Sequence, residues 1–220
     1  MKRLFLGLLA LSVLTTFSSC DKIKQAKDAI AQAAEGIKGV DVDYRMFENQ
    51  EATKKMFDEI VAKMGEQAKV TDDVDFSISR RAHEGSIKRA GEPDELYITI
   101  NTQDPKVATR IQQIKYWSNS GGWKAPEQME VNVIGGNKET FRLEDELWDF
   151  NDKVQFDILY KVMTDAFAKY KDTEKYGDSQ YIKRVAIKKR GYEVTIYGKL
   201  AANEQEKSNY YKADFTGKGK

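Results

Sequence analysis

The fold is decided by residues 151–170, NDKVQFDILYKVMTDAFAKY, and by residues 181–200, YIKRVAIKKRGYEVTIYGKL. In the second stretch apolar and polar residues alternate on both sides of Gly191, which predicts strands at 181–189 and 192–200. A third strand is predicted at 207–216. The first stretch predicts one long helix, because its apolar residues recur three or four positions apart; they are Val154, Ile158, Leu159, Val162, Met163, Ala166 and Phe167.

The same order of elements is predicted in the first half of the chain. A helix is expected from Asn49 to Met64, and Gly65 is expected to end it, because glycine is common just after helices. Strands are then expected around 74–79 and 96–101, where apolar and polar residues alternate.

Two further segments of this half carry turn signals. Asp104-Pro105 either turns a hairpin or begins a helix, and the pattern does not separate these two readings. Gly135-Gly136-Asn137 predicts the turn of another hairpin, with arms at 131–133 and 141–143.

Short sequence similarities accompany the repeated order. Ile98-Thr99-Ile100 is similar to Val194-Thr195-Ile196, and Ile87–Gly91 is similar to Ile187–Gly191. The predicted fold class is therefore α+β, with antiparallel sheets covered by amphipathic helices. Two explanations of the similarity stay open. The globular domain, 41–220, consists either of two helix-plus-three-strand repeats, 44–143 and 144–220, or of hairpins that resemble each other without duplication.

The composition excludes several classes of protein. Without residues 1–19, which contain Lys2 and Arg3, the chain has 34 basic residues against 35 acidic ones, a net charge of about −1. Nucleic-acid binders usually show a clear basic excess, so no nucleic-acid partner is expected. One Cys and one His in the whole chain exclude a disulfide framework and the common zinc sites. No metal and no cofactor are expected.

The first 19 residues predict a secretory signal peptide. Lys2 and Arg3 precede the short apolar run Leu4–Leu14, which is too short to span a bilayer as a helix. The chain's one Cys, Cys20, lies where cleavage would fall. An alternative is an ordinary secreted protein with a free Cys, although an unpaired thiol is unusual in an oxidising compartment.

The segment Phe17-Ser18-Ser19-Cys20 resembles the lipobox of bacterial lipoproteins. Ser18 and Ser19 match its small-residue positions, whereas Phe17 stands where the family usually has Leu. The resemblance implies cleavage before Cys20, acylation of that residue and attachment to a membrane of the cell envelope. Asp21 directs retention at the inner membrane in some bacteria and accompanies export in others. The outer membrane is the expected location here.

A short tether is predicted between Cys20 and the globular domain. Within residues 20–40, Ile23, Ile30 and Ile37 recur every seven residues, which predicts a helix with one apolar stripe. Two heptads are too few for an independent coiled coil. The stripe either packs on its own domain or binds a partner helix.

Few residues suggest catalysis. His83 is the one available imidazole, and we read it as a solvated loop residue. Residues 144–152 form the densest acidic cluster, around Trp148, and we expect it to cap the following helix and contact solvent. The basic run 183–190 is expected to be a solvated edge strand rather than a phosphate site. The acids of the cluster are Glu144, Asp145, Glu146, Asp149 and Asp152.

The expected function is non-catalytic binding of a protein or glycan in the envelope. Tyr116, Trp117 and Trp123 surround the glycine-containing loop 118–122, and such aromatic residues stack on sugars or anchor protein partners. They are also common at the edge of a core. Two alternatives stay open: a hydrolase of envelope polymers that uses the acids of 144–152, and a carrier with an apolar pocket between helix and sheet.

Overall fold

The computed structural model describes residues 42–65, 68–79, 94–130 and 141–219. In chain order the helices are η1 (Met46–Glu48), α2 (Gln50–Met64), η2 (Ser118–Ser120), α3 (Leu143–Glu146), α4 (Phe150–Lys153), α5 (Phe156–Tyr170) and α6 (Thr173–Tyr176). The strands are β1 (Lys69–Ser79), β2 (Glu95–Gln103), β3 (Ile111–Trp117), β4 (Gly122–Trp123), β5 (Glu127–Met129), β6 (Trp148–Asp149), β7 (Tyr181–Lys188), β8 (Gly191–Lys199) and β9 (Glu206–Ala213).

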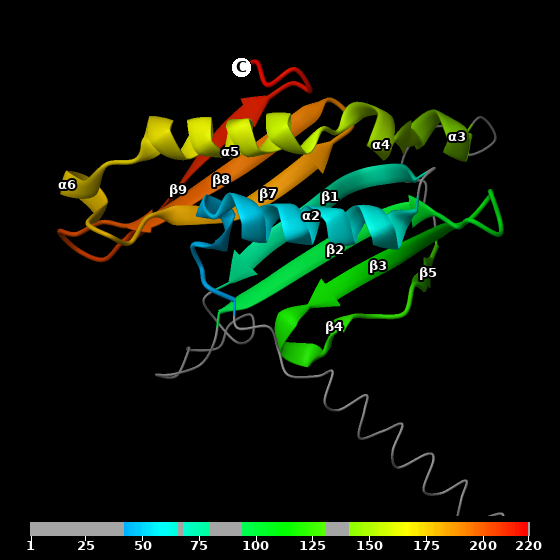
Figure 1. Cartoon of the computed structure of the whole chain (residues 1–220), viewed down its shortest axis with the longest axis horizontal. Coiled ribbons are helices and arrows are strands. Elements are labelled where there is room, and N and C mark those ends of the chain that lie inside the picture. Colours follow the sequence, from blue (N-terminus) through cyan, green and yellow to red (C-terminus); the bar gives the residue numbers. More distant parts are fainter. Residues whose placement is uncertain (1–41, 66–67, 80–93, 131–140, 220) are drawn as a thin grey trace, which may run out of the picture. The chain divides into compact units, whose positions relative to one another are not determined.

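The described strands form one antiparallel sheet in the order β4-β3-β2-β1-β7-β8-β9, with β5 paired to β3 and β6 paired to β1. Each half contributes a helix followed by three strands, α2-β1-β2-β3 and α5-β7-β8-β9. The sequence patterns predicted all of these elements except β3. The halves join where β1 pairs antiparallel with β7, from Val74↔Ile187 to Ser77↔Arg184. Helices α2 and α5 both lie on the same face of the sheet (Figure 1). The α+β prediction is therefore confirmed.

The core fills the space between this face and the two helices. Val74, Phe76 and Ile78 alternate along β1 and are at most 1% exposed. They belong to one cluster with Ile60 of α2 and Leu159 of α5. The predicted alternation on β1 and β2 is thus the inward face of the sheet, and one hydrophobic core connects both halves.

Helix α2 begins and ends where predicted. The side chain of Asn49 accepts a hydrogen bond from the N–H of Ala52, which satisfies one of the free donors of the first turn. Gly65 follows with φ 87°, a conformation that glycine adopts at little cost. The amide of Asn151 donates to the carbonyl oxygen of Gly65 at 3.0 Å, so the second half also supports the end of this helix.

The predicted helix over 151–170 is wrong in one respect, because it is broken. Val154 and Gln155 are extended and separate α4 from α5. The backbone explains the break: Phe150 N–H donates to the carbonyl oxygen of Ala68, and β6 pairs with β1. The chain is tied to the sheet as far as Phe150, and the extended residues Val154 and Gln155 let α5 begin in a new direction over the core.

Three other predictions are settled by the strands. Asp104-Pro105 turns the hairpin between β2 and β3 and does not begin a helix. The hairpin arm expected at 141–143 is wrong, because Leu143 begins α3; residues 131–140 lie outside the described part. The last strand ends at Ala213 rather than at residue 216, because the chain turns there and Asp214 N–H bonds the carbonyl oxygen of Lys218.

Candidate functional site

The sheet face opposite α2 and α5 carries a continuous array of polar and aromatic side chains. Alternation along each strand directs the residues between core positions to this face, and strand register aligns them in two rows across the sheet. We call these two rows the polar face. One row is Trp117, Tyr97, Ser77, Arg184, Thr195 and Tyr210, and the other is Lys115, Thr99, Asp75, Ala186, Glu193 and Lys212.

Ion pairs centred on Arg184 join the two halves of the sheet at the middle of the polar face. Arg184 Nε and Nη2 each lie 2.5 Å from Oδ2 of Asp75, which belongs to β1. Its Nη1 lies 3.5 Å from Oε1 of Glu193 on β8. Lys188 and Lys212 reach the other oxygen of Glu193 at 3.4 and 3.2 Å.

These ion pairs are less exposed than ordinary surface pairs. The side chains of Asp75 and Glu193 are 24% and 13% exposed, and that of Arg184 is 32% exposed. Ser77 Oγ donates to the other oxygen of Asp75 at 2.7 Å. Partial burial and several partners hold Arg184 in one position, so it is preorganised for a contact across the polar face.

The Glu193 carboxyl has a pKa below its usual range. Burial alone would raise this pKa, but hydrogen bonds and electrostatic attraction from Lys212 and Lys188 outweigh it. A carboxyl whose folded-state pKa is lowered stabilises the fold above the unfolded-state pKa. This contribution is lost as pH falls through the folded-state value.

We expect Glu193→Gln to lower the free energy of unfolding at pH 7 by about 1 kcal/mol, because charged hydrogen bonds are lost. The difference should shrink as pH falls below the unfolded-state pKa of about 4.3 and through the lower folded-state pKa, because the carboxyl then becomes protonated in both states. Urea unfolding at pH 7 and pH 3 measures both values. Glu127→Gln is the matched control, since Glu127 pairs with Lys115 at an exposed position. An equal loss at both pH values would contradict the expectation.

The β3 end of the polar face is an aromatic pair fixed by a buried carboxylate. The rings of Tyr97 and Trp117 are stacked, with centroids 5.4 Å apart. Glu95, 1% exposed, accepts from Tyr97 OH at 2.5 Å and from Asn119 Nδ2 at 2.8 Å. Burial and the bond to Glu95 raise the pKa of Tyr97 well above its usual range, so its hydroxyl stays protonated and keeps donating.

The structure separates the three aromatic residues predicted as a binding loop. Tyr116 is 5% exposed and contacts Trp123 edge-on, with ring centroids 5.2 Å apart. Trp123 Nε1 donates to Glu59 of α2 at 3.1 Å, so these two rings extend the core on the helix side. Trp117 lies on the polar face instead, because it is one position further along β3.

Sequence reasoning missed the partners of Trp117 and the ion pairs of Arg184. Tyr97 and Glu95 are not among the predicted site residues, and the basic run that contains Arg184 was assigned to a solvated edge strand. That assignment is wrong, because β7 lies between β1 and β8 in the sheet. Alternation alone indicates which residues share a strand face, but the pairing of distant strands determines which charges meet.

The acidic cluster is divided among short elements. Glu144, Asp145 and Glu146 are exposed on α3, whereas Trp148 is 3% exposed and packs between Phe150 and Phe215. Neither α4 nor α5 has a side-chain hydrogen bond at its N-cap, so the expected capping role is wrong. Within the described ranges, no three His, Cys, Asp or Glu side chains are placed to hold a metal ion. Cys20 and His83 lie outside those ranges.

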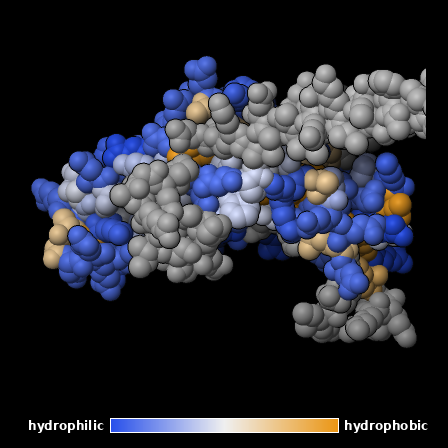
Figure 2. Space-filling view, turned by 90° about the horizontal axis from the view of Figure 1, so that it is seen from below, coloured by the Kyte–Doolittle hydropathy of each residue, from blue (hydrophilic) through white to orange (hydrophobic). Residues whose placement is uncertain are grey.

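Seen from below the view of Figure 1, the described surface is mainly hydrophilic, and its hydrophobic areas are small and separate (Figure 2). In the part of the chain that the structure describes, no helix combines the length and apolar character needed to cross a membrane.

No protein-family model matches the chain, and no curated protein matches it. One similar solved structure is a "putative lipoprotein" from Clostridium difficile 630, with 14% sequence identity and a TM-score of 0.39. The alignment covers 77% of this chain and 88% of that one. A similarity at this level supports no conclusion about function.

Proposed function

We propose that the protein is a lipid-anchored component of the bacterial cell envelope that binds a protein or glycan partner through its polar face. The observation that carries the proposal is the row from Trp117 to Tyr210, which crosses six paired strands. Trp, Tyr and Arg are the side chains most enriched at the energetic centres of interfaces. This row holds all three types.

The rigidity of the polar face supports a binding role. The bond to Glu95 and the stack with Trp117 hold Tyr97, and Asp75 and Glu193 hold Arg184. Side chains ordered before binding lose less conformational entropy when a partner arrives.

The lipid anchor is proposed from the lipobox-like segment and gives the first test. We expect the native protein to fractionate with membranes and to carry acyl chains on its N-terminal Cys20. Cys20→Ala should leave it unacylated, because no thiol remains to be modified. Membrane fractionation and intact-mass spectrometry measure this. A native protein without acyl mass would contradict the proposed anchor.

Tyr210 allows the binding role to be tested with little disturbance of the fold, because its side chain is the most exposed aromatic ring of the row. The residue is 60% exposed, so Tyr210→Ala should leave the fold intact. We expect it to reduce partner capture from solubilised envelopes about tenfold, the loss of one aromatic interface contact. Lys55→Ala is the control, since Lys55 is also exposed but lies on α2, on the opposite side of the sheet. Equal capture by all three proteins would contradict the proposed binding face.

No observation favours either alternative function, the hydrolase or the carrier of an apolar ligand. The acids of 144–152 are spread over α3, β6 and α4, as described above. The space expected to hold an apolar ligand is occupied by core side chains such as Phe47, Phe76 and Phe150, each at most 1% exposed.

A further inference from the structure

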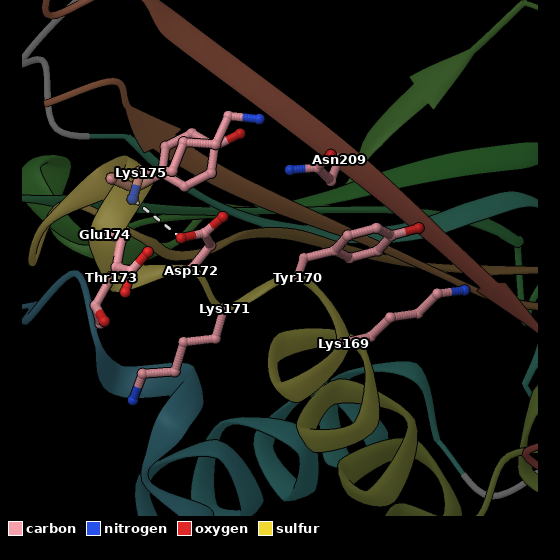
Figure 3. Close-up of a pocket in the computed structure, with 9 residues that line it drawn as sticks. Lys169, Tyr170, Lys171, Asp172, Thr173, Glu174, Lys175 and Asn209 are labelled. Atoms are coloured by element: carbon pink, nitrogen blue, oxygen red, sulfur yellow. Dashed lines mark hydrogen bonds between the residues drawn. The ribbon is translucent and has the colours of Figure 1, made fainter. Parts of the chain in front are cut away.

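A surface cavity of about 500 Å³, largely open to solvent, lies where the end of α5, α6 and β9 meet. Residues 169–176 and Asn209 line it, and Figure 3 shows their side chains around it. The cavity is distinct from the polar face: Asn209 alternates on β9 with Ser208 and Tyr210, which belong to the other face of the sheet. Its volume is in the range of ligand pockets.

The loop that forms the cavity is held by a chain of hydrogen bonds. Gln180, 5% exposed, donates from Nε2 to the carbonyl oxygen of Tyr170 at 2.8 Å. Its Oε1 accepts from the N–H of Asp172 at 2.7 Å. Asp172 Oδ1 in turn accepts from the N–H of Lys175 at 3.0 Å, and Tyr170 OH donates to the carbonyl oxygen of Tyr210 at 3.1 Å. The walls of the cavity are therefore preorganised.

Three kinds of group remain available to a ligand. Oδ1 of Asp172 accepts the bond that caps α6, which leaves Oδ2 to accept another. Asn209 contributes an amide that can both donate and accept. Tyr170 contributes an aromatic ring that its hydroxyl bond fixes in place, with Lys169 Nζ 5.5 Å from the ring centroid. Figure 3 shows these three side chains around a common space, with the bond from Lys175 to Asp172 at its border.

The charges of the cavity do not favour a strongly anionic ligand. The lining holds Lys169, Lys171 and Lys175 against Asp172 and Glu174. Each ammonium group lies over at least one aromatic ring, and Lys169 lies 5.5 Å from the Tyr170 ring centroid in addition to its contact with Tyr211. Lys169 lies 5.2 Å from the Tyr211 ring centroid, Lys171 lies 5.7 Å from that of Phe167, and Lys175 lies 5.3 Å from that of Tyr176. Figure 3 shows the Lys171 side chain directed away from Asn209.

We propose that this cavity binds one neutral sugar unit, either a free saccharide or a residue of a glycan. The C–H face of a sugar ring packs on an aromatic side chain such as Tyr170. Its hydroxyl groups donate to a carboxylate oxygen and exchange hydrogen bonds with an amide, which Asp172 and Asn209 supply. This site does not depend on the polar face, so its success or failure is independent of the function proposed above.

The test is a titration of the whole ¹⁵N-labelled protein in detergent. NMR monitors the titration through the side-chain amide signals of Asn209. The probes are glucose, galactose, mannose and N-acetylglucosamine, each as the free sugar and as a β-linked disaccharide. At least one should shift the Asn209 signals saturably. Tyr170→Leu, which removes the ring, and Asn209→Ala should each weaken binding about tenfold, measured by calorimetry.

Ser208→Ala is the matched control, because the neighbouring Ser208 lies on the opposite face of β9. The affinity of this variant for the sugar should stay within about twofold of the native value. Inorganic phosphate is titrated in parallel. Saturable binding of phosphate without any sugar would overturn the proposal and assign the cavity to an anion. The absence of any shift with every probe up to about 50 mM would mean that no sugar binds with a millimolar dissociation constant, and this too would overturn the proposal. Sugar binding that Tyr170→Leu and Asn209→Ala leave unchanged would also overturn it.

Discussion

Phe76→Ala is expected to lower the free energy of unfolding by about 4 kcal/mol, the cost of removing a large aromatic side chain from a packed core. Phe76 is 1% exposed and lies on β1, at the junction of the two halves of the sheet. Its ring contacts Phe47 edge-on, with centroids 5.6 Å apart. The substitution therefore leaves a cavity that neither half alone can close.

Urea unfolding followed by circular dichroism measures this loss. Met129→Ala is the control, because Met129 is 38% exposed and should cost less than about 1 kcal/mol. If one core connects the halves, both should unfold in a single transition in the native protein and in Phe76→Ala. A small loss, or a transition that splits in two only in the variant, would contradict the shared core.

Gly191→Ala is expected to cost at least about 3 kcal/mol, because it combines backbone strain with a clash. Gly191 begins β8 after the turn from β7, with φ 135°, a conformation that side-chain-bearing residues rarely adopt. A Cβ at this position would lie 2.0 Å from the carbonyl oxygen of Ala213 on β9. The neighbouring strand cannot move away without breaking its pairing with β8.

Gly65→Ala separates the two causes in the same unfolding experiment. Gly65 also has positive φ, 87°, but a Cβ there would meet nothing within 4 Å. It should cost only about 1 kcal/mol from conformational strain. An equal loss of stability in the two variants would contradict the structure, because it would mean that the close approach of β8 to β9 at Gly191 adds no cost.

Local patterns predicted the two long helices and most of the long strands of this fold. Helix α2 has its capping residue, its periodic apolar face and a terminating glycine within one segment of sequence, so each local preference agrees with the structure. The hairpin from β7 to β8 was predicted for the same reason, since alternation and Gly191 coincide. The long helix failed at Val154 because Phe150 and Trp148 are tied to β1, a constraint that comes from a distant part of the chain.

The candidate site was predicted only at Trp117. Its surroundings depend on register: Tyr97 lies beside Trp117, and Arg184 beside Asp75, only because β2, β1, β7 and β3 pair as they do. Arg184 and Asp75 are 109 positions apart in the chain. No local pattern contains that pairing.

The central claim, that the polar face binds a partner in the envelope, is tested most directly by site-specific photo-cross-linking in cells. A photoreactive phenylalanine analogue is placed at Tyr210 in one protein and at Lys55, on the exposed side of α2, in another. After irradiation, the Tyr210 protein is expected to yield one dominant adduct, a defined protein or a glycan-shifted species, and the Lys55 protein should not yield it. The same adduct from both positions, or none from Tyr210 while the protein is folded and present in the envelope, would contradict the account.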